Sequence, residues 1–124
     1  MFDHVKFGVR DFARSKAFYV KALEPIGVTV VTDWPPDGAE MSQPDGESSL
    51  CLYQTDEQPA HLHIAFTASS RNAVDAFYAA ALAAGGKDNG PPGIRPQYSG
   101  QYYAAFVLDP DGHNIEAVYH EADE

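Results

Sequence analysis

Two histidines and one glutamate are the residues of this 124-residue chain whose types suit metal chemistry best. They are His4, His63 and Glu116. Imidazole nitrogens and carboxylate oxygens bind divalent first-row metals, and three protein ligands leave coordination positions open for water, dioxygen or a substrate. The set predicts a site for one divalent ion, and the donor types alone leave Fe, Mn, Zn, Ni and Co open.

Much of the first half of the chain recurs in the second half. The offset is 59 throughout (63 − 4, 77 − 18 and 81 − 22), and it relates His4-Val5, Phe18-Tyr19 and Ala22-Leu23 to His63-Ile64, Phe77-Tyr78 and Ala81-Leu82. A repeated apolar stripe requires only a repeated fold, whereas a histidine repeated at the start of each half indicates that both halves contribute to one site.

The elements that position these residues follow from the phase of the apolar side chains. Apolar residues alternate with polar ones in 2–9, 61–67 and 114–119, so in each stretch they share one face of a strand. His4, His63 and Glu116 are out of phase with those apolar residues. They are therefore expected to point away from the helices and into a shared cleft.

Each half is predicted to form a strand, a helix and further strands. In the first half, Asp11 caps a helix over 12–23 that ends at Pro25, and strands follow over 28–33, 39–42 and 49–53. In the second half, Ser69 or Ser70 caps a helix that Gly85-Gly86 ends, and strands cover 102–108 and 114–119.

These elements predict an α+β fold with two βαβββ modules in tandem, whose curved mixed sheet surrounds a metal-containing cleft. One domain is expected over 1–124, because a chain of this length is about the size of one domain. Module one is expected over about 1–54, a linker over about 55–60, module two over about 61–120 and an acidic tail over 121–124.

The stretch 87–100 is rich in glycine and proline and is expected to form a functional loop. Its residues 87–98 are predicted to act as a lid that excludes water and binds an anionic substrate through Arg95. Tyr98, Tyr102 and Tyr103 are the other candidate substrate-binding residues, and strand register decides which of the last two faces the cleft.

Composition restricts the partners. Eight basic and eighteen acidic residues give a formal net charge of −10, which argues against nucleic acid and anionic membranes as partners. No apolar run approaches the roughly 20 residues of a membrane span, and the sequence begins in a strand pattern rather than a signal region, so a cytoplasmic protein is expected. Cys51 is the single cysteine, which excludes an intrachain disulfide.

Several side chains remain open in function. Lys6 shares the inward face with His4, where it binds an anion, acts as a base if it is desolvated, or, more commonly for lysine, extends to solvent. His113 and His120 are expected to be exposed and without a role.

The repeated His-Val/Ile strand, the Phe-Tyr-x-x-Ala-Leu helix and the closing Asp-Pro-Asp-Gly-His-Asn-Ile-Glu resemble the vicinal oxygen chelate superfamily over nearly the whole chain. That superfamily includes glyoxalase I, fosfomycin resistance thiol transferases, bleomycin resistance proteins and extradiol dioxygenases. The resemblance implies that His4, His63 and Glu116 are the metal ligands, and it allows Glu116 to act as a catalytic base. Bacterial glyoxalase I has a fourth ligand, a glutamate, on the last strand of its first module, where this chain has Leu50 or Cys51.

The resemblance implies a glyoxalase- or dioxygenase-like metalloenzyme. A divalent metal would chelate vicinal oxygens of a small substrate and stabilise an enolate or oxyanion, in lyase or isomerase, transferase or dioxygenase chemistry. His61, Tyr102 and Tyr103 are candidates for the additional catalytic residues of a dioxygenase. The alternative is a metal-free protein that binds a small molecule or antibiotic, as bleomycin resistance proteins do, but sequestration does not require the three ligands.

Short members of this superfamily pair as homodimers, so a homodimer is expected. Two arrangements are open: complete clefts joined back to back, or exchanged modules in which His4 of one chain completes a site with His63 and Glu116 of the other.

Overall fold

The computed structural model describes residues 3–44, 46, 48–57, 62–98 and 100–121. Module one, used here for the half with the first sheet, contains β1 (His4–Val9), α1 (Phe12–Leu23), the 3-10 helix η1 (Glu24–Ile26), β2 (Thr29–Trp34), β3 (Gly38–Ser42) and β4 (Ser49–Gln54). Module two contains β5 (His63–Thr67), α2 (Arg71–Ala83), β6 (Lys87–Ile94), β7 (Tyr102–Leu108) and β8 (Asn114–His120). The candidate catalytic residue His61 lies outside the described residues.

The two modules have the same topology. Their strand orders are β1-β4-β3-β2 and β5-β8-β7-β6, and in each sheet the first strand runs parallel to its neighbour while the other pairs are antiparallel. The predicted α+β fold of two βαβββ modules is confirmed. Because β1 and β5 each lie at the end of a sheet, the strands that carry His4 and His63 have a free edge.

Side-chain caps fix where the two helices begin. The Asp11 side chain accepts a hydrogen bond from the Arg14 backbone N–H, and the Ser70 hydroxyl accepts one from Ala73 N–H. The first helix has the bounds that the sequence predicts, because its cap and the following Pro25 are local signals.

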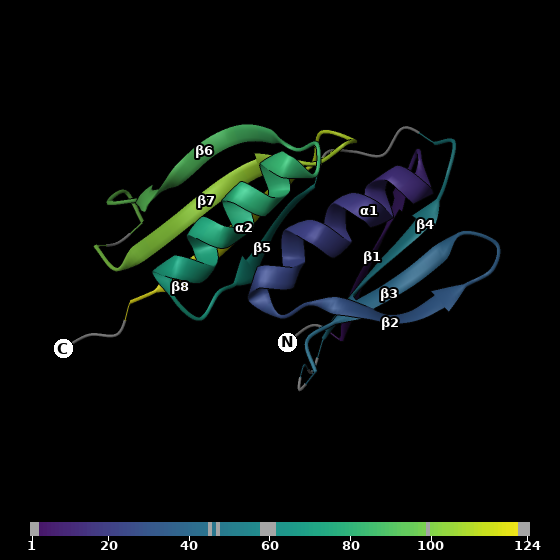
Figure 1. Ribbon diagram of the computed structural model, residues 1–124, viewed down its shortest axis with the longest axis horizontal. Coiled ribbons are helices and arrows are strands. Elements are labelled where there is room, and N and C mark those ends of the chain that lie inside the picture. The colour runs from purple at the N-terminus through teal and green to yellow at the C-terminus, as the bar shows by residue number, and fades with distance from the viewer. Residues whose placement is uncertain (1–2, 45, 47, 58–61, 99, 122–124) are drawn as a thin grey trace.

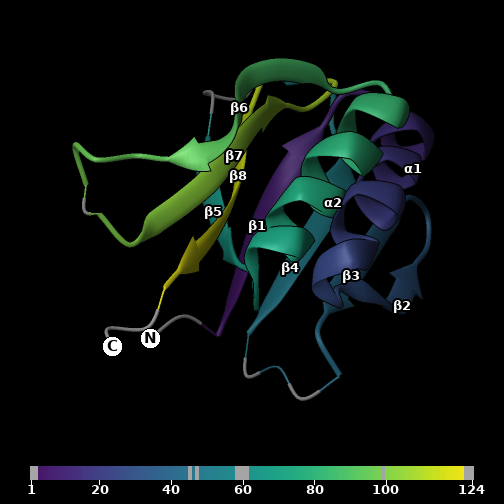
Figure 2. The same cartoon turned by 60° about the vertical axis from the view of Figure 1, so that its left-hand side comes forward.

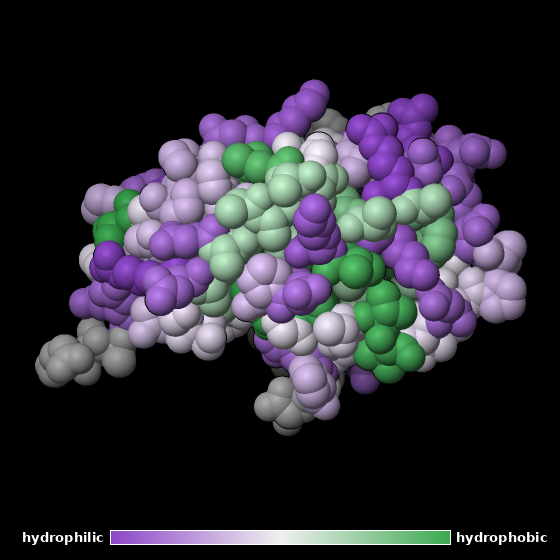
Figure 3. Space-filling model, in the orientation of Figure 1, coloured by the Kyte–Doolittle hydropathy of each residue, from purple (hydrophilic) through white to green (hydrophobic). Residues whose placement is uncertain are grey.

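The helices lie side by side on one side of the molecule, and the two sheets lie behind them (Figures 1 and 2). One core joins both modules, because the fully buried rings of Phe18 and Phe77 belong to the same apolar cluster as strand residues of both sheets. Figure 3 shows the helix-covered surface, where apolar residues gather over the centre among polar ones. In the described part of the chain neither helix is long and apolar enough to cross a membrane.

A buried polar group also joins the modules. The Tyr19 hydroxyl, on α1, donates a short hydrogen bond to Asp109 in the turn between β7 and β8, and both residues are buried. The other Asp109 carboxylate oxygen accepts from the backbone N–H groups of Asp111 and His113. Burial and the neighbouring Asp109 carboxylate raise the pKa of Tyr19 well above its ordinary value.

His113 corrects a sequence prediction. It was expected to be exposed and without a role, yet its side chain is fully buried. Its Nδ1 accepts a hydrogen bond of 2.9 Å from the Leu62 backbone N–H, and its ring meets the Phe7 ring edge-on at 5.3 Å between centroids. His113 therefore supports β5 and the boundary between the modules.

The predicted lid over 87–98 is also wrong in its larger part. Residues Lys87–Ile94 form β6, the outer strand of the second sheet, which pairs with β7. The register shifts between Gly90 and Gly93, so Pro91 and Pro92 lie in an irregular stretch of an edge strand, where their missing N–H groups cost no ladder bond. Only 95–98 remains as a described non-strand segment before residue 99.

Candidate functional site

The sheet faces turned away from the helices carry most of the candidate residues. On β8 the core-facing residues are Ile115 and Ala117, which leaves Glu116 on the outer face. Glu116 pairs with Ala65 of β5 on one side and with Phe106 of β7 on the other. Its side chain is nevertheless only 2% exposed.

A chain of polar contacts joins three of these side chains. The Nε2 atom of His63 lies 2.7 Å from Oε1 of Glu116, and the Tyr102 hydroxyl donates a short hydrogen bond to Oε2. Burial, followed by the bond to the Glu116 carboxylate, raises the pKa of Tyr102 above its ordinary value. Tyr102 therefore stays a hydrogen-bond donor at neutral pH, and the buried carboxylate has a fixed partner on each oxygen.

Two further rings hold Tyr102 in place. The Tyr98 and Tyr102 rings lie 4.8 Å apart, and the His120 ring meets Tyr102 edge-on at 5.1 Å. His120, which the sequence predicted to be without a role, thus supports the residue that orients Glu116. The sequence signal was present, because alternation along β8 places residue 120 on the same face as residue 116.

Arg95 lies beside the same group of residues. Its guanidinium stacks over the Phe106 ring at 5.3 Å and donates a 2.6 Å hydrogen bond to the Pro91 carbonyl. A Cβ at Gly90 or Gly93 would come within 3.2 Å or 3.1 Å of the guanidinium, so the glycines leave room for it to rest there. The Phe106 ring continues to His63 at 6.1 Å, so Arg95, Phe106 and His63 form one continuous surface.

Tyr103 lies elsewhere. Its hydroxyl donates a 2.6 Å hydrogen bond to Asp75 of α2, and the Arg71 guanidinium stacks over its ring. It therefore occupies the helix-covered face of β7, opposite to Tyr102, and the structure does not bring it to the candidate site. Register along β7 separates two tyrosines that the sequence places side by side.

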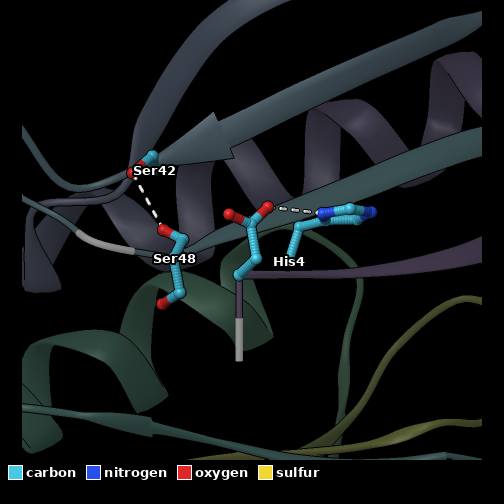
Figure 4. A network of polar contacts seen from close by, with 4 residues as sticks. His4, Ser42 and Ser48 are labelled. Carbon is cyan, nitrogen blue, oxygen red and sulfur yellow. Dashed lines mark hydrogen bonds and ion pairs between the residues drawn. The ribbon is translucent and has the colours of Figure 1, made fainter. Parts of the chain in front are cut away.

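His4 is also apart from the other two proposed ligands. Its side chain is 54% exposed, and its Nδ1 lies 2.7 Å from the neighbouring Asp3 carboxylate (Figure 4). Within the described residues, no three His, Cys, Asp or Glu side chains converge on a point where one ion would fit. A single copy of the chain thus brings His63 and Glu116 together but leaves His4 outside the pair.

Strand register decides between Leu50 and Cys51. On the first sheet His4 pairs with Ser49 and Lys6 with Cys51, and on the second His63 pairs with Asn114 and Ala65 with Glu116. Cys51 is therefore the position of module one that corresponds to Glu116. Its thiol is buried, and burial raises its pKa, so it is less disposed than a carboxylate to bind a cation.

The His63–Glu116 pair fits two coordination positions. Neighbouring ligands of an octahedral ion at about 2.1 Å stand about 3.0 Å apart. The 2.7 Å between Nε2 and Oε1 is close to that spacing, so both atoms could serve as neighbouring ligands once they turned from each other toward a common ion. His63 keeps 53% of its side chain exposed, which leaves the open side accessible.

An open pocket of about 530 Å³ lies along the free edge of β5. It is lined on one side by β5 residues, including His63 and Phe66, and on the other by Val5, Met41 and Leu50 of the first sheet. Neither Glu116 nor Tyr102 lines it, so the pocket adjoins the candidate site at His63 without containing it.

Comparisons with known proteins bear on the whole chain. The family model described as the glyoxalase/bleomycin resistance protein/dioxygenase superfamily matches residues 1–117. The structure resembles that of a glyoxalase/bleomycin resistance protein from Albidiferax ferrireducens T118, with 32% identity over 98% of this chain and 99% of that chain and a TM-score of 0.81.

Two more distant structures share the fold. A glyoxalase/bleomycin resistance protein/dioxygenase family enzyme from Burkholderia phytofirmans PsJN has 19% identity, with 96% of this chain and 98% of that chain covered and a TM-score of 0.76. A lactoylglutathione lyase from Agrobacterium tumefaciens also has 19% identity, with coverages of 96% and 92% and a TM-score of 0.68. No curated protein matches the chain.

Proposed function

Because the chain belongs to the glyoxalase/bleomycin resistance protein/dioxygenase superfamily, we propose that it is a metal-dependent enzyme acting on a small molecule with two neighbouring oxygens. His63 and Glu116 would hold one divalent ion, and His4 would supply the third ligand. The ion would polarise the substrate oxygens and stabilise negative charge as it develops on them. Fe, Mn, Zn, Ni and Co all suit these donors.

The observation that carries this proposal is the contact between His63 Nε2 and Glu116 Oε1. Both atoms are metal donors, their 2.7 Å separation is close to that of adjacent ligands, and the Glu116 carboxylate is buried. His63 and Tyr102 each contact one oxygen of this carboxylate, but His63 is half-exposed and Tyr102 is neutral. A divalent ion would supply a larger compensating charge.

The remaining residues of the site would bind and orient the substrate. Arg95, already stacked on Phe106, would pair with an anionic group, and the exposed ring of Tyr98 would cover an apolar part. Glu116 would release the ion and accept, at Oε1, a proton from a substrate carbon that bears one of the two oxygens. The Tyr102 hydroxyl would keep the carboxylate in the orientation required for that transfer.

We further propose a homodimer in which His4 of a second copy completes the site. Support comes from the free edges of β1 and β5, since exposed strand edges are usually paired or covered in native proteins. The core-facing side chains Ile64 and Phe66 of β5 are only half-buried, which also favours a partner at this edge.

Metal analysis tests the first proposal. Protein purified without a histidine tag is expected to bind one divalent ion per site, and His63→Ala is expected to lose that ion while keeping the far-UV circular dichroism of the parent. Tyr103→Phe is the control, because the Tyr103 hydroxyl bonds to Asp75 on the helix-covered face and does not contact the proposed ligands. Undiminished metal in His63→Ala would exclude the site, and a metal-free protein that still bound a small molecule would support the binding-protein alternative.

Mixing two inactive variants tests the arrangement of the dimer. Light scattering at micromolar concentration should give a dimer. His4→Ala and Glu116→Ala should each lack metal alone, whereas their mixture should regain up to one whole site per mixed dimer if chains exchange modules. A monomer would overturn the dimer, and a mixture without metal would favour clefts that are complete within one chain.

A further inference from the structure

The outer face of the first sheet carries a row of residues that alternates aromatic rings with glycines. Across its four strands, Trp34 of β2 pairs with Gly38 of β3, Gly38 with Tyr53 of β4, and Tyr53 with Gly8 of β1. This set is called the aromatic row below. None of its members belongs to the proposed metal site.

The glycines lie next to both rings, where there is little room for a larger side chain. A Cβ on Gly38 would come within 3.1 Å of the Trp34 ring, and a Cβ on Gly8 would collide with the Thr55 methyl group and come within 3.3 Å of the Tyr53 ring. Any other residue at these positions would force a ring or a neighbour to move. Both rings remain partly open to solvent, with Trp34 36% and Tyr53 39% exposed.

Lys6 places a positive charge over both rings. Its Nζ lies 5.6 Å from the Trp34 ring centroid and 5.3 Å from that of Tyr53. Such contacts hold an ammonium without neutralising it. Glu40 shares this face, but it stands two strands away, with Cys51 between them in register, and no ion pair joins Lys6 to any described carboxylate.

Lys16 is a second lysine whose ammonium lies over an aromatic ring, but its surroundings differ from those of Lys6. Its Nζ also lies over an aromatic ring, 6.0 Å from Phe12, but it forms a 2.7 Å ion pair with Asp33. In a chain with eighteen acidic and eight basic residues, an ammonium that lies over two rings and has no ion pair with a described carboxylate can bind an external anion. The adjoining exposed rings are suited to a flat, apolar partner.

We infer that Lys6, Trp34 and Tyr53 form a binding site for an aromatic ring that carries an anionic group. The anion pairs with the Lys6 ammonium, and the ring of the ligand packs on the exposed parts of Trp34 and Tyr53. Residues two apart on a strand are about 7 Å apart and share a face, so Lys6 stands one step from His4. If the proposed metal function is correct, this site receives the end of the substrate that is remote from the reacting oxygens.

The sole tryptophan of the chain makes the inference testable, because Trp34 gives the single indole N–H signal in a ¹H–¹⁵N spectrum. Benzoate is titrated into metal-free protein in the presence of a chelator, so that the result does not depend on the metal site. A saturable shift of the indole signal is expected. Benzyl alcohol, which lacks the charge, and cyclohexanecarboxylate, which lacks the aromatic ring, should each bind at least about fivefold more weakly.

Variants assign the effect to the residues. Lys6→Met, which keeps an apolar stem, should weaken benzoate binding about five- to tenfold, and Tyr53→Leu should weaken it by a similar factor. Lys16→Met is the matched control and should leave the affinity unchanged. The inference is overturned if benzoate gives no saturable shift, if Lys6→Met binds as well as the parent, or if either comparison ligand binds as tightly as benzoate. The metal content of the parent protein, measured in a separate experiment without chelator, tests the proposed metal site independently of benzoate binding.

Discussion

The outer faces of the two sheets share one backbone arrangement but carry different chemistry. At corresponding positions the first sheet has Cys51 and the second has Glu116. His63 contacts Glu116, whereas the corresponding His4 contacts only its neighbour Asp3 among the interactions of the described residues. The repeat therefore preserves which face of the strand these positions lie on, while the residue at each position determines which side chains are in contact there.

The cationic residues differ between the two faces in the same way. Lys6 corresponds to Ala65 in the repeat, so module two lacks a lysine at that position. It has Arg95 instead, from the segment that follows β6, and that guanidinium also rests on an aromatic ring. On each sheet a cationic side chain thus lies over an aromatic ring, but Lys6 comes from β1 whereas Arg95 comes from the segment after β6. An anionic ligand is consistent with both faces.

Substitutions at the corresponding positions Glu116 and Cys51 should give the largest difference in metal affinity. Glu116→Gln keeps the shape of the side chain but removes its charge, so affinity for the divalent ion should fall by roughly 100-fold or more. Cys51→Ser should change it by less than about twofold, because the buried thiol is not a ligand in this proposal. Isothermal titration of both variants with the same metal checks the difference. A large loss in Cys51→Ser would show that module one supplies a fourth ligand.

The repeated tyrosines should differ in their contribution to stability. Tyr19→Phe leaves the buried Asp109 carboxylate with one donor fewer and should lower the free energy of unfolding by about 1 to 3 kcal/mol. Tyr78, its counterpart, donates to Asp88 at 3.0 Å in an exposed contact, so Tyr78→Phe should change stability by less than about 0.5 kcal/mol. Urea denaturation of both variants measures the difference. Equal losses would mean that the bond between the modules adds nothing beyond an ordinary surface contact.

Tyr102 and Tyr103 are adjacent on β7 but lie on opposite faces, so their substitutions should differ in their effect on metal affinity. Tyr102→Phe removes the donor to Glu116 and should weaken metal binding about tenfold, because residues that orient a ligand usually contribute on this scale. Tyr103→Phe removes the bond to Asp75 on the helix face and should leave metal affinity unchanged. Competition with a coloured chelator gives both affinities. Metal affinity that depends on Tyr103 as strongly as on Tyr102 would contradict the assignment of the two faces.

Alkaline pH gives a smaller and graded test of the Tyr19 contact. The pKa of Tyr19 is raised in the folded state, so the unfolded chain releases this proton first. The stabilisation is complete below the unfolded pKa of about 10 and is lost progressively as pH rises above it. Other tyrosines titrate equally in both proteins, so the stability gap between the parent and Tyr19→Phe should narrow as pH rises above about 10. A gap independent of pH would show that Tyr19 titrates normally.

Local signals predicted the elements well. The helix over Phe12–Leu23 follows from an N-cap, an apolar stripe and a proline after its end, all of which are close in sequence. The face on which His63 and Glu116 lie also follows from strand alternation, which is a property of the backbone. Features that depend on one segment of the chain could therefore be predicted from the sequence.

Strand pairing, register and packing between distant segments could not be predicted from the sequence. The strand Lys87–Ile94 was missed because its irregular pairing with β7 tolerates Pro91 and Pro92, and no local pattern reports a partner strand. Register separates Tyr102 from Tyr103 and identifies Cys51 as the counterpart of Glu116. The burial of His113 depends on how the two modules meet, which the sequence does not state.

The contact between Tyr19 and Asp109 bears on the ancestry of the two halves. The repeat makes Tyr19 and Tyr78 equivalent, yet one bonds across the modules and the other within its own module. A chain built from two copies of module one would lack Asp109 and leave the buried hydroxyl without its acceptor, at a cost of about 1 to 3 kcal/mol. Duplication of a half-length gene would explain the repeat, but the present halves are no longer interchangeable, and recombination that replaced one with the other would be selected against.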